Sequence, residues 1–246
     1  IDLNTSASEG LNGNVAVDSL SVEGFQIDTI RVAMTTDNET IRYSARLQNN
    51  KNNPDYTFRA LLSGKLNESG TDFKAKIYDT HDKLGIDVGL SADVEENGLR
   101  LSFSDPNPLL GYKTFHAAKH NYVFLADDHR VSADLKLVAD DGTGLQLLSN
   151  DENIEAQQDI TASLHQFDLA QILSVLPYTP NITGVMDGDF HLVQSEGEMS
   201  VSTNLAVNKM TYEKSLLGNL STEFVYMPKA DGSHFIDGIF FKDNRQ

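Results

Sequence analysis

The sequence has 246 residues, of which 39% are hydrophobic and 8% aromatic, with a formal net charge of −17 and no cysteine. This length allows one or two domains, and the charge disfavours nucleic acid as a partner, because nucleic-acid binding depends on lysine and arginine neutralising phosphates. The lack of cysteine excludes disulfides and thiolate chemistry, and no apolar run approaches the ~20 residues that span a bilayer.

Apolar and polar residues alternate along most of the chain, which is typical of half-buried β-strands. The clearest runs lie at residues 41–47, 84–90 and 131–139. Turn-forming clusters separate the runs at the close spacing of antiparallel hairpins. These clusters are residues 49–54, 68–70, 95–98, 140–142 and 230–232. The pattern predicts an all-β protein built as an antiparallel meander.

If successive strands keep register, this alternation gives the sheet one continuous apolar face. In an elongated sheet curled into a half-pipe or taco, that face would be the apolar interior of a groove. The same stripe would also line an ordinary β-sandwich core, which periodicity alone favours. The residues expected to line a groove are Leu84, Ile86, Val88, Leu90, Val131, Leu135 and Leu137.

One segment, residues 168–176, is predicted to be a short helix. Asp168 is a suitable N-cap, and Pro177 and Pro180 bar continuation. A helix this short is marginal in water, so packing must hold it. We expect its apolar side to plug or cap the groove, unless it docks a part of the protein outside this sequence. That side consists of Leu169, Ile172, Leu173 and Leu176.

A shift of 190 residues aligns residues 13–23 with residues 203–213. In both copies the apolar parity changes at the same point, after Val17 and after Val207, as a β-bulge or corner would require. Such repetition predicts an elongated stack in which each unit is completed by its neighbours. We therefore expect residues 1–246 to be a fragment of one repeating β domain, with sub-repeats at 1–98 and 99–246.

No group of residues has the spacing of a catalytic or metal site. The seven histidines are scattered, and no serine lies in a nucleophile elbow. The acidic clusters at residues 140–142 and 187–189 are interpreted as hairpin turns, because neither extends into a calcium-binding loop. The sequence therefore predicts a non-catalytic protein without cofactor or metal.

Residues 159–192 resemble the TamB/AsmA pattern, in which a strand leads to a short Asp-Leu helix, a proline, an Ile-x-Gly turn and a small-residue strand. Residues 207–226 are similar to the next repeat of that family. The resemblance covers roughly residues 99–226, with 13–34 as a weaker earlier copy. Both ends of the sequence look like cuts inside a longer protein, so we expect an internal fragment.

The resemblance implies a periplasmic, envelope-spanning β structure, anchored in the full-length protein to the inner membrane of a Gram-negative cell. It implies a role in outer-membrane protein assembly or phospholipid transport. The implied partners are phospholipid acyl chains or nascent outer-membrane proteins, and an outer-membrane partner that binds through regions absent from this sequence. The alternative is a surface β-sandwich that binds glycan or protein, although the absence of tryptophan counts against a glycan platform.

Overall fold

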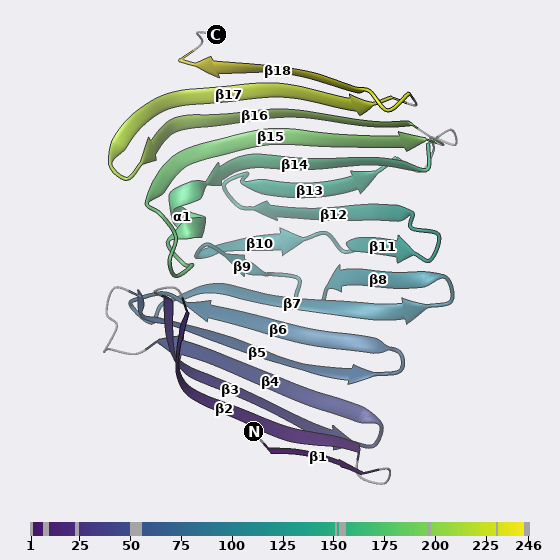
Figure 1. The fold of residues 1–246 in the computed structure, drawn as a ribbon, viewed down its shortest axis with the longest axis vertical. Helices are drawn as coiled ribbons and strands as arrows, with labels where there is room; N and C mark the ends of the chain where they lie inside the picture. The colour runs from purple at the N-terminus through teal and green to yellow at the C-terminus, as the bar shows by residue number, and fades with distance from the viewer. Residues whose placement is uncertain are drawn as a thin grey trace.

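The computed structural model describes residues 2–6, 10–22, 25–49, 56–150, 152, 156–195, 198–229 and 231–243. These residues form eighteen strands of one antiparallel sheet and a single short helix (Figure 1), which confirms the predicted all-β class. The helix is α1 (Leu169–Leu173). The strands are β1 (Asp2–Ser6), β2 (Gly10–Val22), β3 (Phe25–Asp37), β4 (Thr40–Asn49), β5 (Phe58–Asn67), β6 (Gly70–Tyr78), β7 (Leu84–Glu95), β8 (Gly98–Phe103), β9 (Leu109–Leu110), β10 (Lys113–Ala117), β11 (Tyr122–Ala126), β12 (Val131–Ala139), β13 (Gly144–Ser149), β14 (Gln158–Asp168), β15 (Ile182–Ser195), β16 (Glu198–Tyr212), β17 (Ser215–Pro228) and β18 (His234–Lys242).

The sheet is a meander in which most strands pair with their neighbours in sequence. The exception lies at its middle. There β8 and β9 pair with different parts of β7, while β11 and β10 pair with different parts of β12. As a result, β1 and β18 lie at opposite ends of the long axis (Figure 1).

The turn predictions hold at three of the five clusters and at residues 231 and 232 of a fourth, which lie between the paired strands β17 and β18. Residues 68–70, 95–98 and 140–142 each join two paired strands. Residues 50–54 and 230 lie outside the described residues. The interpretation of residues 187–189 as a turn is wrong, because β15 runs straight through them. Gly188 pairs there with Leu205, while Asp187 and Asp189 lie on the opposite face of the strand.

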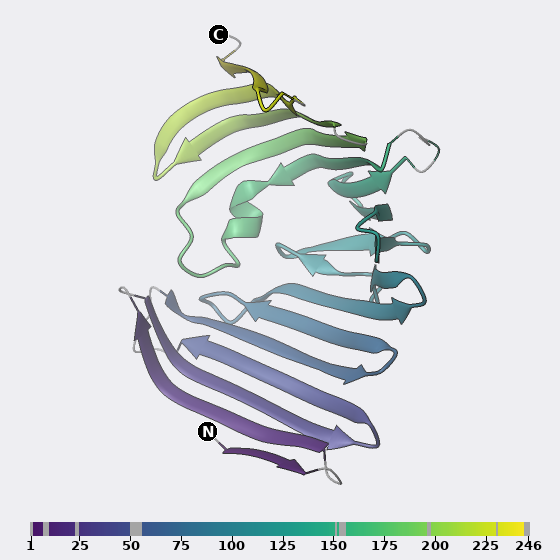
Figure 2. The same cartoon turned by 45° about the vertical axis from the view of Figure 1, so that its right-hand side comes forward.

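The predicted corner is present in both copies of the aligned stretch. Ser19 in β2 and Lys209 in β16 are 190 positions apart, and both adopt positive φ, at 70° and 53°. The pairing of β16 with β17 shifts register between Val207 and Met210. Figure 2 shows that β15, β16 and β17 curve strongly along their length, so the sheet is bent rather than flat.

Full burial is rare in this sheet. Among the described residues, Phe115, Leu137 and Ala139 form the central cluster of buried side chains. The other fully buried hydrophobic residues are Phe58, Ala92, Ala133 and Val175. The accessible surface of 15311 Å² exceeds the roughly 11,000 Å² expected of a compact monomer of this mass. Two packed layers would bury alternate residues in most strands, so the sheet forms a single layer over most of its length.

Candidate functional site

The strand pairings give the sheet one continuous apolar face. Residues paired across an antiparallel ladder present their side chains on the same face, so register identifies the members. A row across the N-terminal half consists of Val15, Val32, Ala45, Leu62, Ala75 and Val88. A row across the C-terminal half consists of Ile160, Leu192, Val201, Tyr226 and Ile236. We call this surface the apolar face.

The side chains of this face remain partly accessible. Most of those in the two rows are half-buried, and large members of the face are well exposed near the C-terminal end. Phe190 is 43% exposed, Phe240 57% and Ile236 63%. A face that is apolar, continuous and partly accessible can take up hydrocarbon, because binding removes its apolar surface from water.

Six of the seven residues expected to line a groove lie on the apolar face. Those six are Ile86, Val88, Leu90, Val131, Leu135 and Leu137. Leu137 is fully buried in the central cluster, however, and is closed off from any groove. Leu84 falls outside the face, because the register with β6 shifts at this point. It pairs with Tyr78, which lies in a row with Arg59 on the opposite side of the sheet, which we call the polar face.

The helix is shorter than predicted but begins as expected. Asp168 is the N-cap, and its carboxylate accepts a hydrogen bond from the backbone N–H of Gln171 at 3.2 Å. The helix ends at Leu173, with Ser174 as its C-cap. The side chains expected to form a plug are half-buried, with none fully enclosed. They are Leu169, Ile172, Leu173 and Leu176.

The enclosed side chain of this region is Val175, just beyond the helix. It is 1% exposed and lies directly against Gly85 of β7. A Cβ atom at Gly85 would stand 2.4 Å from Val175 Cγ2, so the close approach requires glycine there. This packing attaches the segment after α1 to the middle of the sheet.

Tyr178 attaches the same segment to the N-terminal half. Its hydroxyl donates to the carbonyl of Gln26 at 2.5 Å and accepts from Asn49 Nδ2 at 2.6 Å. Its ring stacks on Tyr56 at 4.6 Å and meets the edge of Phe58. Residues 174–181 belong to the β14–β15 connection and contact the ends of β3, β4 and β5. We call these residues the strap. Figure 2 shows α1 and the strap between the two halves of the sheet.

A part-buried hydrogen bond lies beside the strap, where Ser174 also contacts the Tyr112 hydroxyl. Tyr112, between β9 and β10, donates from its hydroxyl to Asp79 Oδ2 at 2.5 Å. Burial, together with this hydrogen bond, raises the pKa of Tyr112 to about 12. Burial also opposes the charge on Asp79. The hydrogen bonds from Tyr112 and from the backbone N–H groups of Lys83 and His81 outweigh it and lower the pKa of Asp79.

Histidines of the polar face each meet a single carboxylate. His116 meets Asp140 at 2.9 Å, and His191 meets Asp159 at 2.7 Å. The part of the chain that the structure describes contains no group of three or more histidines and carboxylates able to hold a metal ion. Within the same residues, no helix is long and apolar enough to cross a membrane.

Sequence reasoning missed the residues that attach the strap, which include Tyr178, Asn49, Val175 and Gly85. Tyr178 and Asn49 are 129 positions apart, and Asn49 stands in a cluster that indicates only a turn. Gly85 did offer a signal, because a glycine inside a strand often marks a bulge or a close backbone approach. Searches against protein-family models, curated proteins and solved structures find no match to this chain.

Proposed function

We propose that this protein is a non-catalytic segment of a periplasmic, TamB/AsmA-like envelope protein that binds acyl chains along its apolar face. The observation that carries the proposal is the apolar face, which includes a row in each half of the sheet, combined with its partial exposure. The curvature of β15 to β17, and the strap lying between the two halves, favour a half-pipe with this face inside (Figure 2).

The energetics of such a surface suit a transport role. Burying each methylene contributes ~0.8 kcal/mol, so a partly covered chain of about a dozen carbons gains several kcal/mol. No specific polar residue is needed, and a chain can move between equivalent positions along the row. An extended segment of a nascent outer-membrane protein would use the same face through its alternate apolar side chains.

Site-specific photo-crosslinking tests the proposal. A photoreactive phenylalanine analogue is placed at Val88 on the apolar face or at Ser91 on the polar face of the same strand. The chain is expressed in the periplasm of a Gram-negative host, irradiated, purified without detergent and analysed by mass spectrometry. We expect phospholipid adducts at Val88 and few at Ser91. Equal labelling at both positions, or no lipid adduct at Val88, would overturn acyl-chain binding; polypeptide adducts at Val88 alone would indicate a protein cargo.

A further inference from the structure

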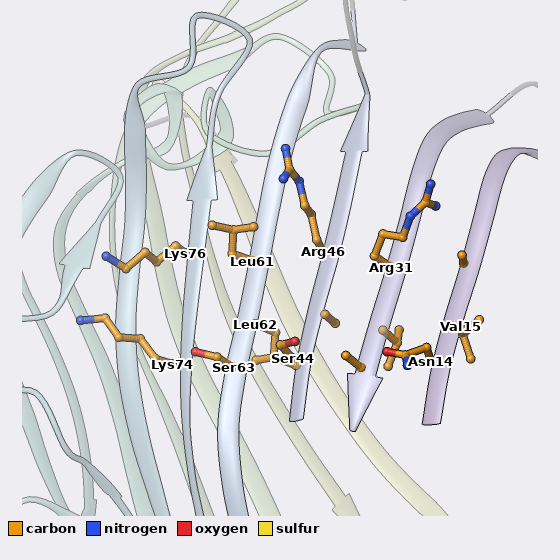
Figure 3. Close-up of a pocket in the computed structure, with 14 residues that line it drawn as sticks. Asn14, Val15, Arg31, Ser44, Arg46, Leu61, Leu62, Ser63, Lys74 and Lys76 are labelled. Carbon is orange, nitrogen blue, oxygen red and sulfur yellow. The ribbon is translucent and has the colours of Figure 1, made fainter. Parts of the chain in front are cut away.

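The polar face of β2 to β6 carries a trough whose charged lining residues are all cations (Figure 3). Its volume is about 460 Å³, within the range of small-molecule sites. The charged residues are Arg31, Arg46, Lys74 and Lys76. The chain as a whole has 36 acidic and only 19 basic residues, so composition does not account for this grouping.

Strand register builds the trough from two adjacent rows. One row places Arg31, Arg46, Leu61 and Lys76 side by side. The next row places Ala33, Ser44, Ser63 and Lys74 side by side. Three of the four side chains in the second row are small, and they lie next to the long side chains of the first row. A ligand can approach the sheet there, with long cationic side chains beside it and serine hydroxyls beneath it.

The cations differ in how well their charge is balanced. Arg31 forms an ion pair with Asp18, and Lys74 and Lys76 share Asp87, each at 3.1 Å. Arg46 has no carboxylate partner within the described residues, and its guanidinium donates to the Gln48 side chain.

Arg46 also stands directly opposite Arg31. Like charges at opposed positions of a sheet destabilise it. An anion placed between the two guanidiniums would relieve this repulsion.

We propose that this trough is a binding site for a phosphate-bearing ligand, with the phosphate held by Arg46 and Arg31. The planar guanidinium presents paired donors that match two oxygens of a phosphate, and such charge-assisted pairs are the stronger hydrogen bonds. Ser44 and Ser63 supply neutral donors for further oxygens. The cations and serines belong to rows of opposite parity to the apolar face on the same strands, although four residues of that face, Val15, Val32, Ala45 and Leu62, also line the trough. Free phosphate, a sugar phosphate and a lipid headgroup share this chemistry.

Titration followed by NMR tests the site. The chain, labelled with ¹⁵N, is titrated at low ionic strength with pyrophosphate, with glucose 6-phosphate and with dihexanoyl phosphatidic acid. We expect saturable shifts of the Arg46 Nε–H and of the Ser44 and Ala33 amides. Saturation by all three probes assigns recognition to the phosphate. Saturation by phosphatidic acid alone assigns the site to a lipid headgroup. Saturation by glucose 6-phosphate alone assigns it to a sugar phosphate.

Variants separate this site from general attraction of anions. Arg46→Gln should weaken binding roughly tenfold or more, because it removes a charged hydrogen-bond donor. Arg46→Lys, which keeps the charge, should bind more tightly than Arg46→Gln. Ser44→Val should weaken binding, because it replaces a hydroxyl on the floor of the trough with methyl groups. Arg130→Gln makes the same change of charge at an exposed turn and should leave affinity unchanged. The proposal is overturned if no probe gives saturable shifts, or if Arg46→Gln and Arg130→Gln weaken binding equally in variants with wild-type circular dichroism.

Discussion

The hydrogen bond between Tyr112 and Asp79 makes stability depend on pH at the alkaline end. The folded pKa of Tyr112 is raised to about 12 from its ordinary value of 10. A raised pKa contributes stability that is complete below pH 10 and is lost as pH rises through about 12. Tyr112→Phe should abolish this alkaline loss, measured as urea midpoints between pH 9 and 12. Tyr212→Phe, at a 48% exposed position, should keep it.

The same hydrogen bond should act in acid through Asp79. Its folded pKa lies below the ordinary value of 3.8, so its contribution is complete above that value and is lost as pH falls through the folded pKa. Tyr112→Phe removes one of the hydrogen bonds that hold the pKa down. We expect the acid unfolding midpoint of this variant to move to higher pH. A midpoint equal to that of the wild type would show that the backbone N–H groups alone keep Asp79 ionised.

The contact between Val175 and Gly85 should behave as a coupled pair. Val175→Ala removes two enclosed methyl groups and should lower the free energy of unfolding by about 2 kcal/mol. Gly85→Ala inserts a Cβ 2.4 Å from Val175 Cγ2 and should cost about 1 to 3 kcal/mol through overpacking.

In the double variant, the new methyl group occupies the space that Val175 vacates. We therefore expect its loss to be smaller than the sum of the two single losses by at least ~0.5 kcal/mol. Denaturant melts of the four proteins complete the cycle, and strict additivity would contradict the contact. Leu173→Ala is a useful comparison. Because Leu173 is only half-buried, it should cost less than the ~2 to 5 kcal/mol of a fully buried leucine.

At the scale of elements, the strap should hold distant strands together. Tyr178→Ala removes the hydroxyl that bonds to Gln26 and Asn49 and the ring that stacks on Tyr56. We expect faster amide hydrogen exchange at the strap-facing ends of β3 to β5, including the amide of Asp28, which donates to Asn49 Oδ1. Exchange in β16 and β17 should stay unchanged. Tyr212→Ala serves as the control, and equal exchange rates in wild type and Tyr178→Ala would refute the strap.

The elements differ in how far local sequence determines them. The alternation in β4, β7 and β12 predicts these strands, because each has one apolar and one polar side within the sheet. The start of α1 is also local, since Asp168 caps it with its own side chain. Beyond α1, Val175 packs against the distant Gly85 and Tyr178 accepts a hydrogen bond from the distant Asn49. No short-range pattern records such contacts, so neither could be predicted.

At the scale of the whole molecule, the apolar and polar faces of the sheet follow from the alternation of residues along each strand. The curvature of the sheet does not follow from that alternation. The strand pairings from β2 to β18 keep apolar residues on one face, as the alternation predicted for strands that keep register, although register shifts at Leu84 and between Val207 and Met210. The residues within strands that depart from extended backbone, with positive φ, include Ser19, Gln166 and Lys209. Only the first and third of these were signalled, through the change of apolar parity in the aligned copies.

The outer edge of β18 should promote self-association. No strand among the described residues pairs with this edge, and Ile236 beside it is 63% exposed. Exposed apolar edge strands pair readily with other chains. We expect sedimentation velocity to detect association that increases with concentration, and Ile236→Lys to suppress it. Val185→Lys, which adds the same charge at a 39% exposed site within the sheet, should have little effect.

The meander with its ends at opposite poles also has a mechanical consequence. Ladder hydrogen bonds run perpendicular to the strands, which here is along the long axis of the molecule (Figure 1). A tension applied between the two ends would therefore load these bonds along their own direction, one strand at a time. The sheet would lengthen by unzipping from its ends at low force rather than resisting by shear. Tyr178 and Val175, which connect strands far apart in the ladder, are the cross-links that such tension would have to break before the middle of the sheet could extend.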